Sequence, residues 1–329
     1  MTAASAGLLG VTDPALQASV AAGLAKVEDR LREVVRSSHP LLSEAAAHLV
    51  EAGGKRFRPL LALVAGSFGD VDRLEVVDAA VVVELTHLAT LYHDDVMDEA
   101  AVRRGAASAN ARWTNTVAIL TGDYLFARAS DLTAGLGTEA THLQSRTFAR
   151  LVEGQIAETA GPAEGADPVA HHLKVLADKT ASLISTSARL GAMMAGAAPD
   201  VVETLASYGE VIGVAFQLSD DLIDVLSETG QSGKTPGTDL REGIATLPVL
   251  LAREEGDRAL LDVLEADLSS DAALAEALRL LRAHPSMERA RARLEAYADE
   301  ARSIAQSLPE GPPRDALVAL TDYVLERTG

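Results

Sequence analysis

The chain has 329 residues, a formal net charge of −19 and no cysteine. Such acidity argues against nucleic acid as a partner and against steady binding to anionic lipid. The lack of cysteine excludes disulfides, thiolate nucleophiles and Cys-ligated zinc, and it fits a reducing, cytoplasmic location. No apolar run approaches the ~18 residues that span a bilayer, so we expect no stable membrane insertion.

The composition favours an all-α protein. Alanine, leucine and valine are abundant, aromatic residues make up 3% of the chain, and the alternation typical of strands is nearly absent. Residues 1–11 are small and apolar without a basic segment, and we interpret them as a disordered tail, not a signal peptide. No later linker is long or polar enough to divide the chain, so residues 12–329 are predicted to form one helical domain.

The first two predicted helices lead to a basic segment. Asp13 and Pro14 mark the start of a helix that should run towards Ser38, and Pro40 starts a second one that ends at Gly53 and Gly54. The sequence GGKRFRP, residues 53–59, then places three cations within one turn. Its glycines permit close backbone approach, and its cations attract an anion. Taken alone, such a segment is more often a solvated loop; together with a second anion site, it indicates a second diphosphate pocket.

A long helix is predicted next, with apolar residues at helical spacing over 71–88 and aspartates at its end. Asp94 and Asp98 are four residues apart, so they are neighbours on one face and repel each other. A divalent cation bridging both carboxylates would turn this repulsion into ligation. Arg103 and Arg104 follow, and the guanidinium fork suits phosphate oxygens. The pattern indicates a metal-diphosphate site, with a solvated acidic helix end as the alternative for this motif alone.

Further helices are predicted over 109–136, with a break near 115, and over 139–160, 169–197 and 199–227. The last contains FQLSDDLIDV, residues 216–225, in which Asp220 and Asp224 are again four apart and Gln217 shares the face of Asp220. Two matched aspartate sets predict two helices of one bundle that point their carboxylates at each other. The Gly-rich segment 227–243 is interpreted as a flap that brings Lys234 to a phosphate, with an ordinary surface loop as the alternative.

Taken in order, these segments resemble the trans-isoprenyl (polyprenyl) diphosphate synthases. The resemblance rests on GGKRFRP, on HDDVMD followed by RRG, on KT at 179–180, on FQLSDDLID and on GKTPGTDLREGIATLP, and it covers roughly residues 20–329. It implies an all-helical bundle around a deep central cavity, usually a homodimer, with both aspartate motifs at the cavity mouth. One departure stands out, because Ile244 occupies the place of a lysine that usually contacts phosphate.

The resemblance also implies roles for individual residues. The residues that would hold isopentenyl diphosphate are Lys55, Arg58 and His87, with Arg104 beside them. The magnesium ligands would be Asp94, Asp98 and Asp220. The allylic diphosphate would be held by Arg103, Lys179, Gln217 and Lys234, and Thr180 and Gln217 would lie near the developing allylic cation.

The implied reaction explains these residue types. Ionising an allylic diphosphate leaves a highly charged leaving group that magnesium, Arg and Lys stabilise, and the cation must be kept from water in an apolar cavity. Two other classes remain as alternatives. A class I terpene cyclase would not need the second basic cluster at 55–58, and a non-catalytic helical partner subunit would not be expected to keep both aspartate motifs.

The length of the product is predicted from the helix that ends in the first motif. One turn inward from Asp94 lie Thr90 and Ala89, followed by Thr86 and Val83, none of which is aromatic. The sequence HLATLYHDD also resembles the long-chain branch of the family. We therefore expect a product longer than geranylgeranyl diphosphate, with geranylgeranyl or farnesyl diphosphate as the alternative if another helix supplies a floor, for example through Phe126 or Met193.

Overall fold

The computed structural model describes residues 11–227 and 236–327, so nearly all of the predicted tail and the flap residue Lys234 lie outside the described residues. The described helices are α2 (Pro14–Val34), α3 (Pro40–Glu51), α4 (Phe57–Gly66), α5 (Leu74–Met97), α6 (Ala109–Arg112), α7 (Asn115–Leu136), α8 (Thr138–Ala160), α9 (Pro168–Leu176), the π-helical η1 (Ala177–Ala181), α10 (Ser182–Met194), α11 (Pro199–Leu226), α12 (Thr238–Arg241), α13 (Leu247–Glu255), α14 (Arg258–Leu264), α15 (Asp271–Ala283), α16 (Ser286–Gln306) and α17 (Pro312–Glu326).

The all-α prediction is confirmed. The strands found among the described residues are β1 (Val102–Arg103) and β2 (Ala106–Ala107), which form a two-residue antiparallel pair. The helix starts at Pro14 and Pro40 are where the sequence places them, and the Asp13 carboxylate caps α2 by accepting a hydrogen bond from the Leu16 amide at 2.8 Å. None of the described helices combines the length and the apolar character needed to cross a membrane.

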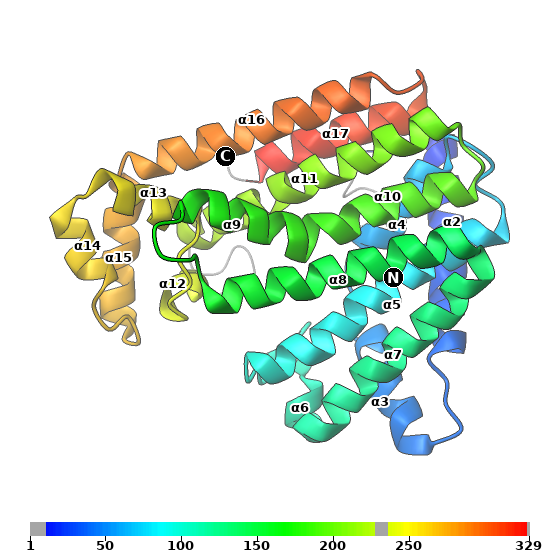
Figure 1. Ribbon diagram of the computed structural model, residues 1–329, viewed down its shortest axis with the longest axis horizontal. Coiled ribbons are helices and arrows are strands. Elements are labelled where there is room, and N and C mark those ends of the chain that lie inside the picture. Colours follow the sequence, from blue (N-terminus) through cyan, green and yellow to red (C-terminus); the bar gives the residue numbers. More distant parts are fainter. Residues whose placement is uncertain (1–10, 228–235, 328–329) are drawn as a thin grey trace.

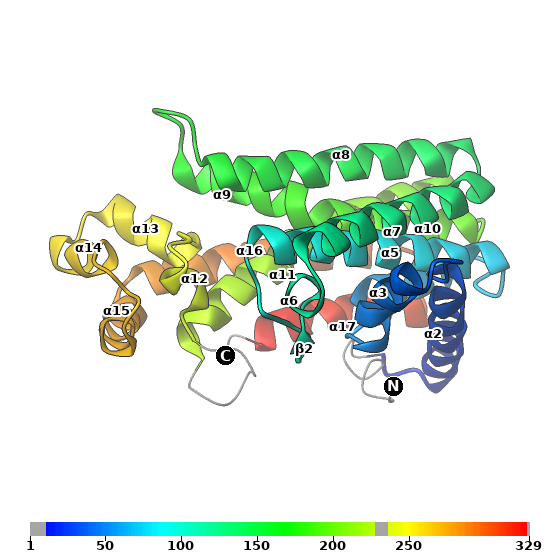
Figure 2. The same cartoon turned by 90° about the horizontal axis from the view of Figure 1, so that it is seen from below.

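The long helices pack as layers (Figure 1). In that view α16, α17, α11, α10 and α8 lie one below another, with α5 and α7 beneath them, while Figure 2 shows α8 and α9 as an outer layer. The most extensive contacts join α5 to α7, α10 to α11 and α4, and α11 to α16. The short helices α13, α14 and α15 form a separate group at one end, on the left of Figure 1. The site described next lies between α5, α8 and η1.

The prediction of one continuous helix over 169–197 was wrong in two respects. The chain is helical from Pro168 to Met194 and not to 197, and five residues within this range form a π-helical turn, η1, between α9 and α10. Such turns widen the helix locally and are frequent at functional sites. This one carries Lys179 and Thr180, two of the predicted site residues.

Candidate active site

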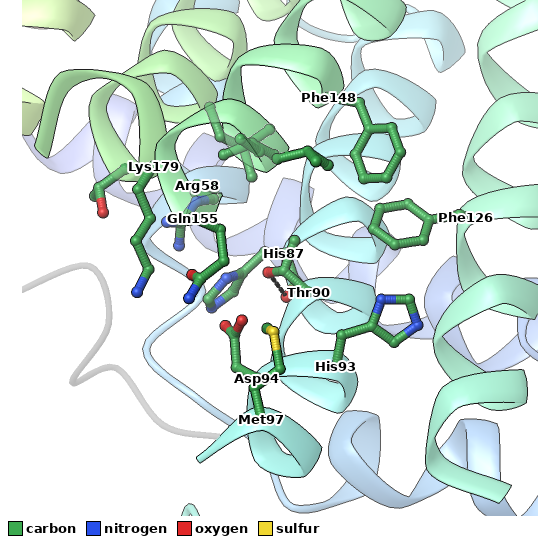
Figure 3. A pocket seen from close by; sticks show the side chains of 14 residues that line it. Arg58, His87, Thr90, His93, Asp94, Met97, Phe126, Phe148, Gln155 and Lys179 are labelled. Atoms are coloured by element: carbon green, nitrogen blue, oxygen red, sulfur yellow. Dashed lines mark hydrogen bonds between the residues drawn. The ribbon is translucent and has the colours of Figure 1, made fainter. Parts of the chain in front are cut away.

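Side chains from six helical elements converge on a cavity of about 180 Å³ (Figure 3). Of the predicted site residues, the lining includes Arg58, His87, Asp94, Lys179 and Thr180. Figure 3 shows Asp94, Gln155 and Lys179 near one another at one side of this space and Phe126 with Phe148 at the other. The remaining lining residues are Thr90, His93, Met97, Leu151, Val152 and Leu183. The cavity therefore has a charged mouth and an aromatic and aliphatic interior.

The acidic end of α5 faces this mouth. Burial raises the pKa of the Asp94 carboxyl to about 6, the nearby Lys179 ammonium opposes this rise, and the Asp98 carboxylate adds to it. Asp98 is the exposed C-cap residue of α5. The carboxylates of Asp94 and Asp98 are near each other, as predicted. Burial and this like charge disfavour the ionised form of Asp94, and a bound cation would stabilise it.

Asp95, between them in sequence, has a different environment. It is fully buried, and its Oδ1 accepts a hydrogen bond from Arg103 Nε at 2.6 Å. Arg103 also lies 3.9 Å from Asp98. The arginine predicted to hold an allylic diphosphate is thus paired with α5 carboxylates in this structure.

A magnesium ion fits these donors chemically. Carboxylate oxygens are the hard ligands that Mg²⁺ prefers, and the ion is commonly held by one or two carboxylates together with substrate phosphates and waters. Among the described residues, no group of three or more His, Asp or Glu side chains is arranged to hold a metal. Asp94, with a raised pKa next to Asp98, matches the smaller donor set that a metal bound to diphosphate requires.

The basic segment at 53–59 divides into buried and exposed cations. Arg56 has a left-handed backbone with φ of 48°, is 2% exposed, and forms ion pairs with Glu28 at 2.6 Å and Glu84 at 2.9 Å. It is therefore a structural residue. Lys55 is exposed, whereas Arg58 lines the cavity and its buried Nε has no hydrogen-bond partner.

Arg58 and His87 line the cavity on another side, with the Arg104 guanidinium close to both. Burial lowers the pKa of Arg58 to about 10, and burial together with the surrounding arginines, Arg58 foremost, lowers the pKa of His87 well below its usual value. His87 is therefore neutral at physiological pH and can donate one hydrogen bond. Arg104 donates to the carbonyl oxygens of Leu49 and Gly53, which ties the RRG segment to the glycine turn.

The π-turn η1 is held from two sides by glycines. A Cβ added at Gly154 of α8 would lie 2.6 Å from the Lys179 amide nitrogen, and one added at Gly213 of α11 would lie 2.6 Å from Ala181 Cα. Only glycine allows backbones to approach this closely. The Lys179 ammonium forms an ion pair with Glu158, also from α8. The packing of α8 and α11 therefore fixes where Lys179 enters the cavity.

The second aspartate motif lies on α11, beyond the contact with η1. Asp220 pairs with Arg327, whose guanidinium lies 4.4 Å from the centroid of the Phe216 ring. Asp221 accepts a hydrogen bond from His172 at 2.9 Å, taking the ring nitrogen as the donor. Asp224 accepts from the backbone amide of Thr238 at 3.1 Å. Each of these carboxylates has a protein partner.

Phe216 connects this motif to the basic segment. Its ring stacks on Phe57 with a centroid distance of 5.3 Å, and Phe57 precedes the cavity residue Arg58. The lining formed by the described residues does not include Gln217, Asp220, Lys55, Arg103 or Arg104. Their predicted ligand roles remain predictions.

Several cavity residues were not predicted from the sequence. Phe148, Leu151 and Gln155 lie on one face of α8 at helical spacing, a stripe that sequence periodicity could have revealed. Phe126 was predicted as a candidate floor and does line the cavity, in contact with Phe148 at a centroid distance of 4.2 Å. Ala89 does not: it belongs to the core between α5 and α7, where Gly122 faces its carbonyl oxygen.

Comparison with known proteins identifies the family. Residues 39–281 match the polyprenyl synthetase family. The chain belongs to the polyprenyl synthetase family. It is 50% identical over 321 residues to the nonaprenyl diphosphate synthase of Mycobacterium tuberculosis, an alignment that covers 96% of either chain. Family membership and these relatives identify the enzyme class as the trans-prenyltransferases, and they do not favour a terpene cyclase or a non-catalytic subunit.

Solved structures of the polyprenyl synthetase family share this fold. A decaprenyl diphosphate synthase from Rhodobacter capsulatus superposes with a TM-score of 0.87 at 36% identity, covering 95% of this chain and 98% of its own. A geranylgeranyl pyrophosphate synthase from Corynebacterium glutamicum, crystallised with calcium and isoprenyl diphosphate, superposes with a TM-score of 0.87 at 44% identity, covering 97% and 99%. Both a long-chain and a shorter-chain enzyme are therefore close in structure.

Proposed function

We propose that this polyprenyl synthetase condenses isopentenyl diphosphate with an allylic diphosphate, in a magnesium-dependent reaction, and repeats the step to a trans-polyprenyl diphosphate longer than geranylgeranyl. One observation carries the proposal: the cavity joins a carboxylate with a raised pKa, a lysine and a second cationic cluster at one end to an apolar interior at the other. The 50% identity to a nonaprenyl diphosphate synthase supports the long product.

The proposed allylic site lies at Asp94, Asp98 and Lys179. A magnesium ion bound with the substrate would supply positive charge to the diphosphate as it leaves. In this arrangement Asp94 and Asp98 hold the metal, and Lys179, released from Glu158, adds a cation to the phosphate oxygens. Asp220 joins the metal site in the proposal, which requires it to exchange its present partner Arg327. Gln217, Arg103 and Lys234 complete the proposed phosphate contacts, and Thr180 lies in the cavity wall where the cation would form.

The proposed isopentenyl diphosphate site lies at Arg58, His87 and Arg104, with Lys55 at its edge. The buried Nε of Arg58 lacks a partner, and a phosphate oxygen would satisfy it. Because its pKa is lowered, His87 can bind as a neutral donor without adding a further charge to the arginine cluster. Two separate anion sites on one cavity are what a two-diphosphate reaction requires, and a cyclase acting on a single diphosphate would need only one.

The aromatic pair Phe126 and Phe148 bears on the chain length of the product. Phe148 packs against an aliphatic cluster from α5, α7, α8 and α10 that includes Val83, Leu151 and Leu190. A product longer than geranylgeranyl would have to pass between or beside the two rings to reach this region. We therefore propose that the rings part during elongation, and that substitution of either ring by a smaller side chain lengthens the product.

We also propose a homodimer. Four exposed large hydrophobic side chains lie at the same end of the antiparallel helices α7 and α8, namely Ile119, Leu120, Val152 and Ile156. An exposed apolar patch of this kind marks a protein interaction site. Light scattering of the wild type and of an Ile156→Asp variant tests the dimer: the variant should be monomeric.

The proposal also includes a cytoplasmic location and a single domain over residues 12–329.

The experiment that tests the function uses purified protein, labelled isopentenyl diphosphate, magnesium and a series of allylic primers, with the products sized after dephosphorylation. We expect incorporation that depends on both substrates and on the metal, with the main product longer than four isoprene units. Activity on the allylic diphosphate alone would instead indicate a cyclase. A main product of four units or fewer would contradict the proposed chain length.

A further inference from the structure

A second cavity lies behind the candidate active site and is larger than it. Its volume is about 540 Å³, and it is bounded by the end of α8, by α9, by the segment 243–245 and by α13. The wall is mostly apolar, with contributions from Pro162, Pro168, Val175, Ile244, Ala245 and Leu250. A volume of 300 to roughly 1,000 Å³ with an apolar wall and few polar groups is typical of a small-molecule site.

The Ile244 side chain in this wall is unusually exposed for a large hydrophobic residue. It is 40% exposed, and it is the one exposed large hydrophobic side chain among described residues beyond residue 156. The place where relatives are expected to carry a lysine therefore holds an aliphatic side chain that faces the cavity. Among the described residues, no segment fills this space.

The charges at the rim select the kind of ligand. Glu158 is paired with Lys179, and Glu254 is paired with Arg289 at 2.8 Å. Arg253 also lines the cavity, is exposed, and has no ion-pair or hydrogen-bond partner among the described residues. The charge left over at this rim is therefore a single guanidinium, which attracts a phosphate or carboxylate.

We propose that this cavity binds an amphipathic anion, an apolar chain with one phosphate or carboxylate head, with the chain against Val175, Ile244 and Leu250 and the head at Arg253. The cavity adjoins the candidate active site through two contacts: its wall residue Glu158 pairs with Lys179, and its wall residue His172 is hydrogen-bonded to Asp221 of the second aspartate motif. The site goes beyond the proposed prenyl transfer and does not depend on it. A free prenyl phosphate and a lipid head group share this chemistry.

The test uses dodecyl phosphate below its micellar concentration as the probe, titrated calorimetrically into the full-length protein. We expect saturable binding to the wild type, about tenfold or more weaker binding to Arg253→Glu, because a charged hydrogen bond is lost, and weaker binding to Ile244→Asp. Arg258→Glu is the matched control: it makes the same charge change on an exposed residue nearby that is not in the lining, and it should bind as the wild type does. Inorganic phosphate should not compete, because it lacks the apolar chain.

Two further measurements separate the outcomes. Equal affinity of wild type and Arg253→Glu would place the probe elsewhere and overturn the proposal, as would the absence of binding to the wild type. Sedimentation with phosphatidylglycerol vesicles distinguishes the sources: we expect no Arg253-dependent binding to vesicles, since the net charge is −19, so that a free amphipathic anion is the ligand. Prenyl transfer by Arg253→Glu should equal that of the wild type, so failure here leaves the proposed function intact.

Discussion

The substitution Gly154→Ala tests whether the approach of α8 to η1 positions Lys179, the lysine that we propose to contact the allylic diphosphate. A Cβ at this position would lie 2.6 Å from the Lys179 amide nitrogen and 3.1 Å from Asp178 Cβ, both closer than ordinary van der Waals contact. Since carbon contacts are optimal near 3.5 to 4 Å, the backbones would have to separate by roughly 0.8 Å or more. A misplacement of about 1 Å at a catalytic group costs up to about a hundredfold in rate.

We therefore expect Gly154→Ala to lower kcat by about ten- to a hundredfold and to destabilise the fold by about 1–3 kcal/mol through overpacking. Lys179 is assigned to the allylic diphosphate. The factor by which kcat/KM for the allylic primer falls should therefore exceed the factor by which KM for isopentenyl diphosphate rises. Steady-state assays with either substrate varied, combined with thermal denaturation, measure these effects.

Gly135 supplies the control. It is also a helical glycine, in α7, but a Cβ added there would meet no atom within 4 Å. Gly135→Ala should keep full activity and gain up to about 1 kcal/mol of stability from the better helix former. If Gly154→Ala retained kcat within twofold of the wild type, or if both variants behaved alike, the idea that α8 positions η1 would be refuted.

Three further predictions follow from burial and charge. Substituting Phe126 or Phe148 by alanine should shift the products to longer chains while isopentenyl diphosphate is still incorporated, and an unchanged size distribution would refute the role of the rings. Arg56→Ala should cost up to about 3–5 kcal/mol because it removes the nearest cation from the buried Glu84, which keeps only Arg104 at 3.7 Å. Lys55→Ala should instead leave the melting temperature unchanged and raise KM for isopentenyl diphosphate, and equal stability losses would contradict the distinction. In metal-free protein, the raised pKa of Asp94 means that the folded state keeps a proton which the unfolded state releases, so wild-type stability falls as pH rises from the unfolded pKa of 3.8 to the folded pKa of about 6 and is level above it. Asp94→Asn should accordingly raise the melting temperature at pH 8 but scarcely at about pH 3.5, below the unfolded pKa, and an equal change at both pH values would argue against the burial effect.

The sequence predicted the helices that carry strong local signals. Pro14 and Pro40 start helices because a missing amide proton costs nothing in the first turn, and the apolar spacing before Asp94 describes a buried helix. These signals are local in the chain, so they can be read without the fold. The helices after residue 247 were not predicted in detail, although they cover α11 and bring Arg327 to Asp220.

The sequence predicted those cavity residues whose side-chain type leaves few other uses. Half-buried among packed helices, Asp94 and Lys179 have little use apart from binding charged groups. The partners of those residues depend on tertiary packing, which explains why Glu158 opposite Lys179 was not anticipated. Arg56 and Arg58, two residues apart in one basic segment, illustrate the limit: one is neutralised by glutamates from other helices and the other lines the cavity. Sequence spacing could not assign them different roles.

Product length depends on packing in the same way. Thr90 and Ala89 are adjacent in the sequence, but Thr90 lines the cavity while Ala89 packs between α5 and α7. Two rings from α7 and α8, Phe126 and Phe148, also line the cavity in contact with each other, and only Phe126 was named from the sequence. Side chains from non-adjacent helices meet only in the folded structure.

The most direct test of the central claim is magnesium-dependent binding of an allylic diphosphate, measured calorimetrically on the wild type and on the double variant Asp94→Ala, Asp220→Ala. The account predicts that magnesium strengthens binding to the wild type and has no effect on the double variant, which should also fail to incorporate isopentenyl diphosphate. Undiminished metal-dependent binding and chain elongation by the double variant would contradict it.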